Sequence, residues 1–131
     1  MKHGTEPAAD TPDEAVLTSH HLSAVIRTSK DFVASSRDLV DLLSSSARAV
    51  GLTPVAHTEA AFDPTGASAV VLLAESHVAV HHWPECDRLT VDIHVCDYRR
   101  DNLARAWQLA RLVEENSAQE GVDWCSFSVA E

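Results

Sequence analysis

The feature that most constrains the fold is the stretch over residues 70–96, where side chains follow the two-residue period of β-structure. An apolar strand opens the stretch, passes through the tripeptide Glu75-Ser76-His77 and then alternates apolar and polar residues. A second alternating strand, residues 89–96, follows a short polar connection. Alternation at this period is typical of strands that bury one face, and a short connection favours antiparallel pairing. The stretch therefore predicts two neighbouring antiparallel strands.

The rest of the chain adds three strands and two helices. Apolar residues at helical spacing predict amphipathic helices, and shorter alternating runs predict strands. The expected elements are a strand at 20–27, a helix capped by Ser29 or Asp31 that ends near Val50, a strand at 53–62, a helix from Asp101 to about Asn116 and a strand at 122–129. The order β-α-β-β-β-α-β predicts an α+β two-layer sandwich, in which two helices cover one face of a mainly antiparallel sheet.

The length of the chain limits the number of domains, and its net charge limits the kinds of partner it can bind. The 131 residues fit one domain, which we expect over residues 18–131, preceded by a disordered polar tail over residues 1–17. Ten Lys and Arg residues against 20 Asp and Glu residues give a formal net charge of −10. This balance argues against nucleic-acid binding, which calls for a basic surface, and it is compatible with a cationic substrate.

Cysteine usage and hydropathy bear on the compartment. The three cysteines are an odd number and do not make a disulfide framework. The polar first residues do not resemble a signal peptide, and no apolar run is long enough to span a bilayer. We therefore expect a protein of the reducing cytoplasm, without a membrane partner.

Three chemically active side chains lie in or beside the two central strands. They are the hydroxyl of Ser76, the imidazole of His81 and the thiol of Cys96. Pairing of the strands is expected to bring them into one neighbourhood. A single serine, histidine or cysteine on a strand is more often an ordinary structural residue, and a free cysteine is commonly a small core residue. The joint spacing of the three residues is what favours a reactive site.

The segments AESHVAVHHWPE (74–85) and VDIHVC (91–96) resemble the signature of the prokaryotic S-adenosylmethionine decarboxylase proenzymes. These are pyruvoyl-dependent enzymes of polyamine and spermidine synthesis. The resemblance extends loosely over residues 18–131 and is specific over residues 62–96. It implies autocatalytic cleavage of a zymogen between Glu75 and Ser76, with Ser76 converted into the pyruvoyl group.

The resemblance also implies roles for further residues. His81 would accept a proton during processing, with help from Ser68, and Cys96 would give a proton to the decarboxylated substrate. The substrate amine would form a Schiff base with the pyruvoyl carbonyl, which acts as an electron sink. Substrate-binding positions correspond to Phe62, Trp83 and Glu85. The family arrangement further implies a homodimer of cleaved chains whose sheets pack face to face.

Three alternatives stay open. The family pattern usually has other residues at His82, His94 and Asp97, and an added carboxylate near the proton donor would suit a cationic amino acid, such as arginine or ornithine. An unprocessed, non-catalytic partner subunit of the same fold is a second alternative. A zinc site is a third and weaker one, because no tight metal-binding motif is present; its ligands would be His77, His81 and His82 with Cys86 or Cys96.

Overall fold

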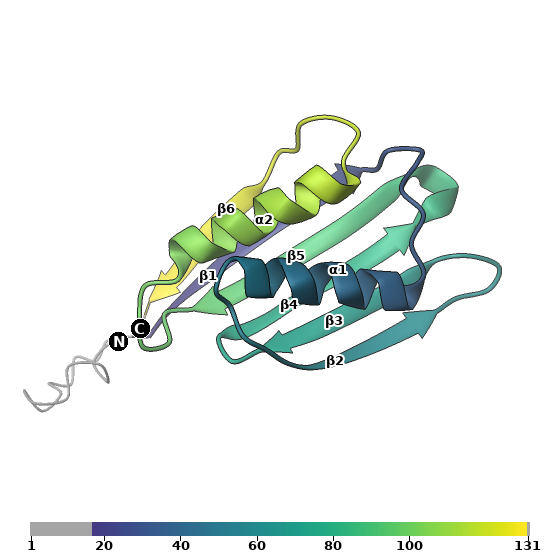
Figure 1. The fold of residues 1–131 in the computed structure, drawn as a ribbon. Coiled ribbons are helices and arrows are strands. Elements are labelled where there is room, and N and C mark those ends of the chain that lie inside the picture. The colour runs from purple at the N-terminus through teal and green to yellow at the C-terminus, as the bar shows by residue number, and fades with distance from the viewer. Residues whose placement is uncertain (1–16, 131) are drawn as a thin grey trace, which may run out of the picture.

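The computed structural model, which describes residues 17–130, confirms the predicted α+β sandwich (Figure 1). Of the predicted tail, all but Leu17 lies outside the described residues. No helix in the described part is long and apolar enough to cross a membrane. The elements are β1 (Thr18–Arg27), α1 (Ser36–Ala49), β2 (Pro54–Ala61), β3 (Ala67–Leu73), β4 (Ser76–Trp83), a 3₁₀ turn (Pro84–Cys86), β5 (Arg88–Cys96), α2 (Leu103–Ser117) and β6 (Cys125–Ala130).

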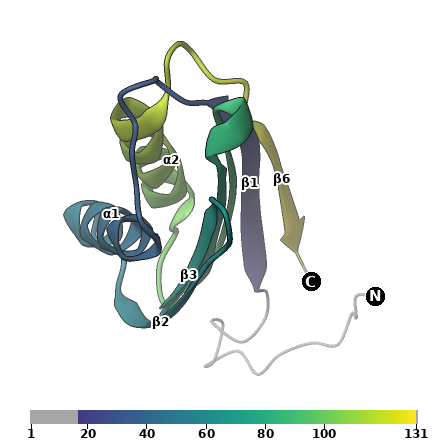
Figure 2. The ribbon, with the colours of Figure 1, turned by 90° about the vertical axis from the view of Figure 1, so that its right-hand side faces the viewer.

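Both helices lie on the same side of the sheet (Figure 2). Alternate residues of the strands face the helices, so that Leu22, Val80 and Ile93 are almost fully buried. Leu43 of α1 and Leu109 of α2 close the core from the helical side and are 0% exposed. The apolar core therefore fills the single space between the helical layer and the sheet.

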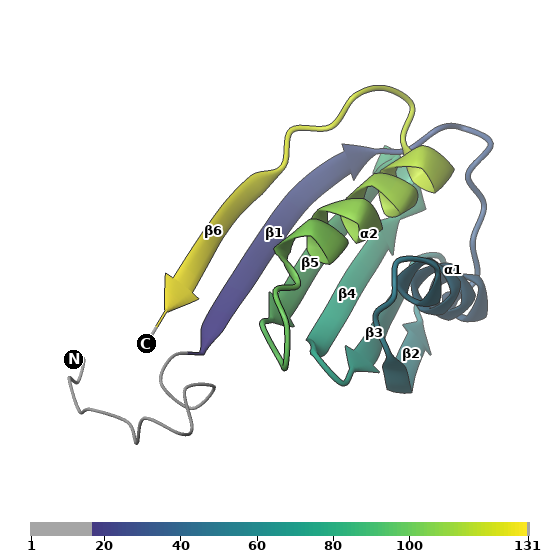
Figure 3. The same cartoon turned by 60° about the vertical axis from the view of Figure 1, so that its left-hand side comes forward.

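The six strands follow the spatial order β2-β3-β4-β5-β1-β6, and each neighbouring pair is antiparallel (Figure 3). Pairing between β4 and β5 places Ser76 opposite Val95 and His77 opposite His94. The N-terminal strand β1 lies inside the sheet between β5 and β6. The strands that carry the predicted site are thus central rather than peripheral.

The opposite face of the sheet, called here the open face, is not covered by any element of residues 17–130 (Figure 2). It carries large apolar side chains that are about half exposed: Val25, Leu72, Trp83, Phe127 and Val129. Large apolar side chains gathered on one exposed face commonly mark an interaction site.

Both helices start later than predicted. The N-cap of α1 is Ser35, not Ser29 or Asp31, because Ser35 and Asp38 form a reciprocal capping box. The residues before it form an irregular connection, in which Val33 is 86% exposed. For α2 the N-cap position is Asn102, one residue after the predicted Asp101.

The prediction of one strand across the tripeptide was wrong, because the chain reverses at Ala74 and Glu75 and makes β3 and β4 an antiparallel hairpin. The sheet therefore has six strands rather than five. Thr53 holds this turn: its carbonyl accepts a hydrogen bond from the Ala74 N–H (2.8 Å). Its N–H and hydroxyl both donate to the Glu75 carboxylate, each at 3.1 Å. No glycine or proline marks the turn in the sequence.

Candidate active site

The Glu75–Ser76 peptide bond lies at the tip of the β3–β4 hairpin. Glu75 is only 5% exposed, and its carboxylate is held by Thr53. Ser76 has a backbone φ angle of +150°, which residues other than glycine rarely adopt. Such a conformation costs on the order of 1–3 kcal/mol and persists only where the surroundings impose it. The hairpin therefore holds backbone strain at the peptide bond that the sequence predicts to be cleaved.

Cys96 lies beside this peptide bond. Its backbone N–H donates a 2.9 Å hydrogen bond to the Glu75 carbonyl oxygen. Burial, with smaller contributions from the carboxylates of Asp97 and Glu75, raises the pKa of the Cys96 thiol above its ordinary value. The thiol therefore keeps its proton at neutral pH, as a proton donor must. The structure thus places the backbone of Cys96 beside the Glu75–Ser76 peptide bond.

Ser68 and His81 form a second group. They lie directly opposite each other on β3 and β4, and the Ser68 Oγ is 2.6 Å from the His81 Nδ1. A small cavity of about 80 Å³ beside them is also lined by the three predicted substrate-binding residues, Phe62, Trp83 and Glu85. The structure therefore gathers these five predicted residues at one place.

The two groups are separated within one chain. His81 follows Ser76 by five residues along β4, which corresponds to about 16 Å at about 3.3 Å per residue. The expectation that Ser76, His81 and Cys96 share one neighbourhood is therefore wrong for His81. A strand keeps its residues apart along its axis, so a single chain carries two half-sites: a cleavage half-site (Glu75, Ser76 and Cys96) and a Ser68–His81 half-site.

A row of aromatic rings crosses the open face next to the cleavage half-site and was not predicted. His77, His94 and His21 lie opposite one another on β4, β5 and β1, and Phe127 of β6 continues the row. The His21 ring stacks on His94 at 4.2 Å and on Phe127 at 4.6 Å between centroids. Burial first, and then the charges of His21 and His77, lower the pKa of His94. Each histidine was visible in the sequence, but the row depends on strand register.

The residues of the zinc alternative do not come together. His77 lies on the open face, whereas His82 is buried on the helix face at 5% exposure, against the ring of Phe32. Burial lowers the pKa of His82. Among the described residues, one group has metal-binding atoms within 4.8 Å of one another, and it consists of His20, Asp97 and Asp101.

Comparisons with known proteins identify the family of the chain. The sequence profile described as S-adenosylmethionine decarboxylase matches residues 19–121. A protein of Hydrogenobaculum sp. named S-adenosylmethionine decarboxylase proenzyme is 36% identical over 80 residues, which is 61% of this chain and 60% of that protein. The protein of the same name from Persephonella marina is 31% identical over 109 residues, covering 83% of this chain and 82% of its own length.

A solved structure extends the similarity to the fold. The crystal structure of the adenosylmethionine decarboxylase from Aquifex aeolicus superposes with a TM-score of 0.73 and 27% sequence identity, covering 86% of this chain and 89% of that one. The family profile spans most of the chain, including the hairpin and both half-sites. The chain therefore belongs to the S-adenosylmethionine decarboxylase family.

Proposed function

We propose that the protein is a self-processing, pyruvoyl-dependent decarboxylase of S-adenosylmethionine, which makes the aminopropyl donor for spermidine synthesis. The observation that carries the proposal is the strained Ser76, whose preceding carbonyl is held by the N–H of Cys96. The free cysteines among the described residues fit a cytoplasmic enzyme.

Processing begins when the Ser76 hydroxyl attacks the Glu75 carbonyl carbon and the peptide bond is exchanged for an ester. The Cys96 N–H is placed to stabilise the negative charge that develops on the Glu75 oxygen. Loss of the Ser76 α-proton then expels the Glu75 carboxylate and leaves dehydroalanine, which takes up water and releases ammonia. The products are a chain ending at Glu75 and a second chain that begins with a pyruvoyl group.

The hairpin suits the pyruvoyl group, because the new end stays beside β5 while Thr53 keeps hold of the Glu75 side chain. When present, the pyruvoyl carbonyl supplies an electron sink for loss of carbon dioxide. The backbone of Cys96 is bonded to the Glu75 carbonyl, and in this proposal its protonated thiol returns a proton to the substrate carbon.

We propose that a second copy of the chain completes each site. The proton acceptor for Ser76 has to come from elsewhere, because His81 of the same chain lies about 16 Å along the strand. Two sheets that pack through their open faces lie about 10 Å apart, and an isologous pair exposes each half-site to the other copy. The apolar side chains of the open face would be buried in the same step. The Ser68–His81 half-site of one copy then serves the cleavage half-site of the other.

The Ser68–His81 half-site also suits the proposed substrate. Phe62 and Trp83 are about half exposed and offer aromatic faces to an adenine ring or a sulfonium. Glu85 adds a carboxylate at the same cavity. The arginine or ornithine alternative rested on the carboxylate of Asp97, but this group pairs with the buried His20 on the helix side. That observation supports S-adenosylmethionine over a cationic amino acid.

Mass spectrometry of the denatured, purified protein tests processing. We expect two chains divided between Glu75 and Ser76, the second with a blocked amino end, and a single intact chain for the Ser76→Ala variant. Release of carbon dioxide from S-adenosylmethionine, arginine and ornithine then identifies the substrate. An intact wild-type chain would contradict the proposed processing and favour the non-catalytic partner subunit.

Co-expression tests the shared site. Ser76→Ala and His81→Ala chains should each stay intact alone. When they are co-expressed, the His81→Ala chain should be cleaved, because its Ser76 meets the His81 of the other chain. Failure of this rescue, with both chains folded and paired, would contradict a site shared between two copies.

A further inference from the structure

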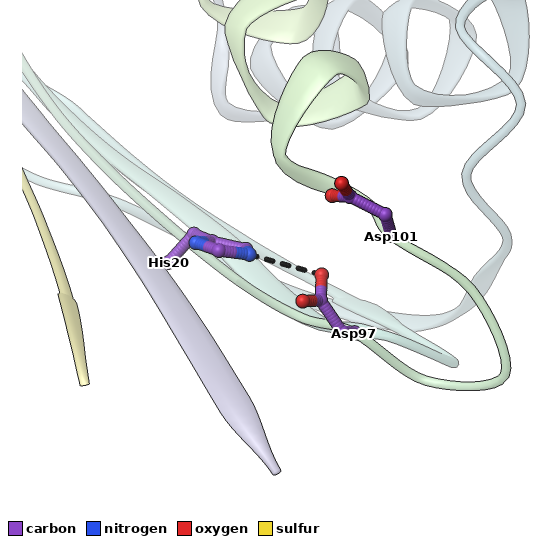
Figure 4. A group of neighbouring side chains, drawn as sticks. All are labelled: His20, Asp97 and Asp101. Atoms are coloured by element: carbon purple, nitrogen blue, oxygen red, sulfur yellow. Dashed lines mark hydrogen bonds and ion pairs between the residues drawn. The ribbon is translucent and has the colours of Figure 1, made fainter. Parts of the chain in front are cut away.

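A polar cluster with two buried members and one partly exposed member lies behind Cys96 and is not used by the proposed reaction. It consists of His20 on β1, Asp97 after β5 and Asn102 before α2, and is called here the His20 cluster. His20 is 6% exposed and Asn102 is 0% exposed. The His20 Nε2 lies 2.9 Å from the Asp97 Oδ1 (Figure 4), and its Nδ1 lies 2.7 Å from the Ser128 Oγ. Buried polar groups are costly unless they are bonded in this way.

The cluster is a hydrogen-bond network rather than a cation site. Both nitrogens of His20 are already engaged. The nearby Asp101 carboxylate accepts the backbone N–H of Leu103 at 3.0 Å. A cation would have to replace these bonds at the start of α2, where the helix dipole disfavours positive charge.

The network ends on the backbone of Cys96. Asp97 Oδ1 accepts the N–H of Asn102 at 2.8 Å, and Asn102 Nδ2 donates to the Cys96 carbonyl at 3.0 Å. The other backbone group of Cys96, its N–H, is the donor to Glu75. The backbone of Cys96 is therefore held at its carbonyl by Asn102 of the His20 cluster together with the Tyr98 N–H (2.8 Å), and at its N–H by the carbonyl of the cleavage site.

We propose that His20, Asp97 and Asn102 are positioning residues that hold the Cys96 thiol beside Ser76 for proton donation. The inference rests on the proposed role of Cys96 in decarboxylation.

The surroundings of Cys96 favour a protonated thiol. Burial and the carboxylates of Asp97 and Glu75 all raise the thiol pKa. The residue paired with Cys96 on the neighbouring strand β1 is the uncharged Ser19. His94, two residues earlier on β5, has a lowered pKa that keeps its ring neutral at pH 7. Of the groups that raise the thiol pKa by charge, Asp97 is the one that belongs to the His20 cluster.

Alkylation of Cys96 by iodoacetamide tests the inference without relying on turnover. For this experiment Cys86 and Cys125 are both replaced by serine, so that Cys96 is the one remaining thiol. The alkylation rate is then followed from pH 6 to pH 10. Asp97→Asn should lower the thiol pKa; a shift of half a unit raises the rate at pH 7 about threefold. Asp41→Asn removes an equal charge on the exposed side of α1 and should leave the alkylation profile unchanged.

Steady-state kinetics with S-adenosylmethionine supply the second readout. Asn102→Ala should lower kcat about tenfold, equivalent to about 1.4 kcal/mol, with KM within about twofold. His20→Gln keeps a donor for Asp97 and should retain most of the kcat that His20→Ala loses.

The outcomes separate the inference from the proposed function. An unchanged alkylation profile and kcat in folded Asp97→Asn and Asn102→Ala, beside an active wild type, would overturn the positioning role and leave the decarboxylase standing. Full activity of Cys96→Ser would instead refute the proton donor itself, which is part of the proposed function.

Discussion

The hydrogen bonds that Thr53 donates to Glu75 should determine the rate of self-cleavage. Thr53→Val is nearly isosteric and removes one of the two donors to the Glu75 carboxylate, while the backbone donor stays. A hydrogen bond to a charged group contributes about 1.5–3 kcal/mol, and Glu75 is 5% exposed, so water replaces it poorly. If this bond keeps Ser76 in its strained conformation, its loss raises the processing barrier by the same amount. Cleavage should then slow by about tenfold to about 150-fold.

Cell-free synthesis followed by intact mass measurement gives the cleavage rate from the time of release. Thr53→Ser keeps the hydroxyl donor and should process within about twofold of the wild type. Thermal unfolding of a non-cleaving Ser76→Ala background, with and without Thr53→Val, reports whether the fold is kept. Wild-type cleavage rates in a folded Thr53→Val protein would refute the idea that the side-chain hold drives processing.

Further predictions concern pH and packing. The lowered pKa values of His82 and His94 mean that the unfolded chain binds more protons near pH 6 than the folded chain does. The contribution of these two histidines to the free energy of unfolding should be fully present above about pH 6.5, and it should be lost as the pH falls toward the folded pKa values. The Tm should be lower at pH 5 than at pH 7.5, and a higher Tm at pH 5 would contradict this sign. His94→Phe keeps a ring next to His21 and should reduce the acid loss, whereas an unchanged loss would exclude His94 as its source. Leu109→Ala, at 0% exposure, should cost about 2–5 kcal/mol in urea unfolding, and a loss below 1 kcal/mol would show that the core closes over the gap.

Much of the fold followed from the sequence because burial on one side of a sheet imposes alternation. Val78 and Val80 were expected on one face of β4 and His77 and His81 on the other, and the burial and pairing of these residues agree. Local rules located elements less well at their ends. Helix α1 begins after the capping box of Ser35 and not after Ser29 or Asp31. All three residues are of a type that caps helices, so residue type alone could not locate the first turn.

The division into two half-sites could not be predicted from spacing alone. The buried positions change from odd-numbered residues in β3 to even-numbered residues in β4, but residues 70–74 are all apolar, so the sequence pattern did not reveal this change or the reversal before Ser76. Thr53, which lies more than 20 residues earlier in the sequence, donates two hydrogen bonds to Glu75 at the reversal. The contact of the buried His20 with Asp97 joins residues that are still farther apart in the sequence.

The fold of this protein does not require an unbroken bond between Glu75 and Ser76, whereas the proposed cleavage reaction does. Thr18 and Ala130 are paired neighbours on β1 and β6, so a short linker could join them. A circular permutant would then begin at Ser76, end at Glu75 and keep all six strands of the sheet. Its Ser76 would already be a free amino terminus, with no acyl bond to exchange, and it would remain serine. The same architecture would thus be built without the proposed pyruvoyl group, because formation of that group depends on the order in which the residues are joined.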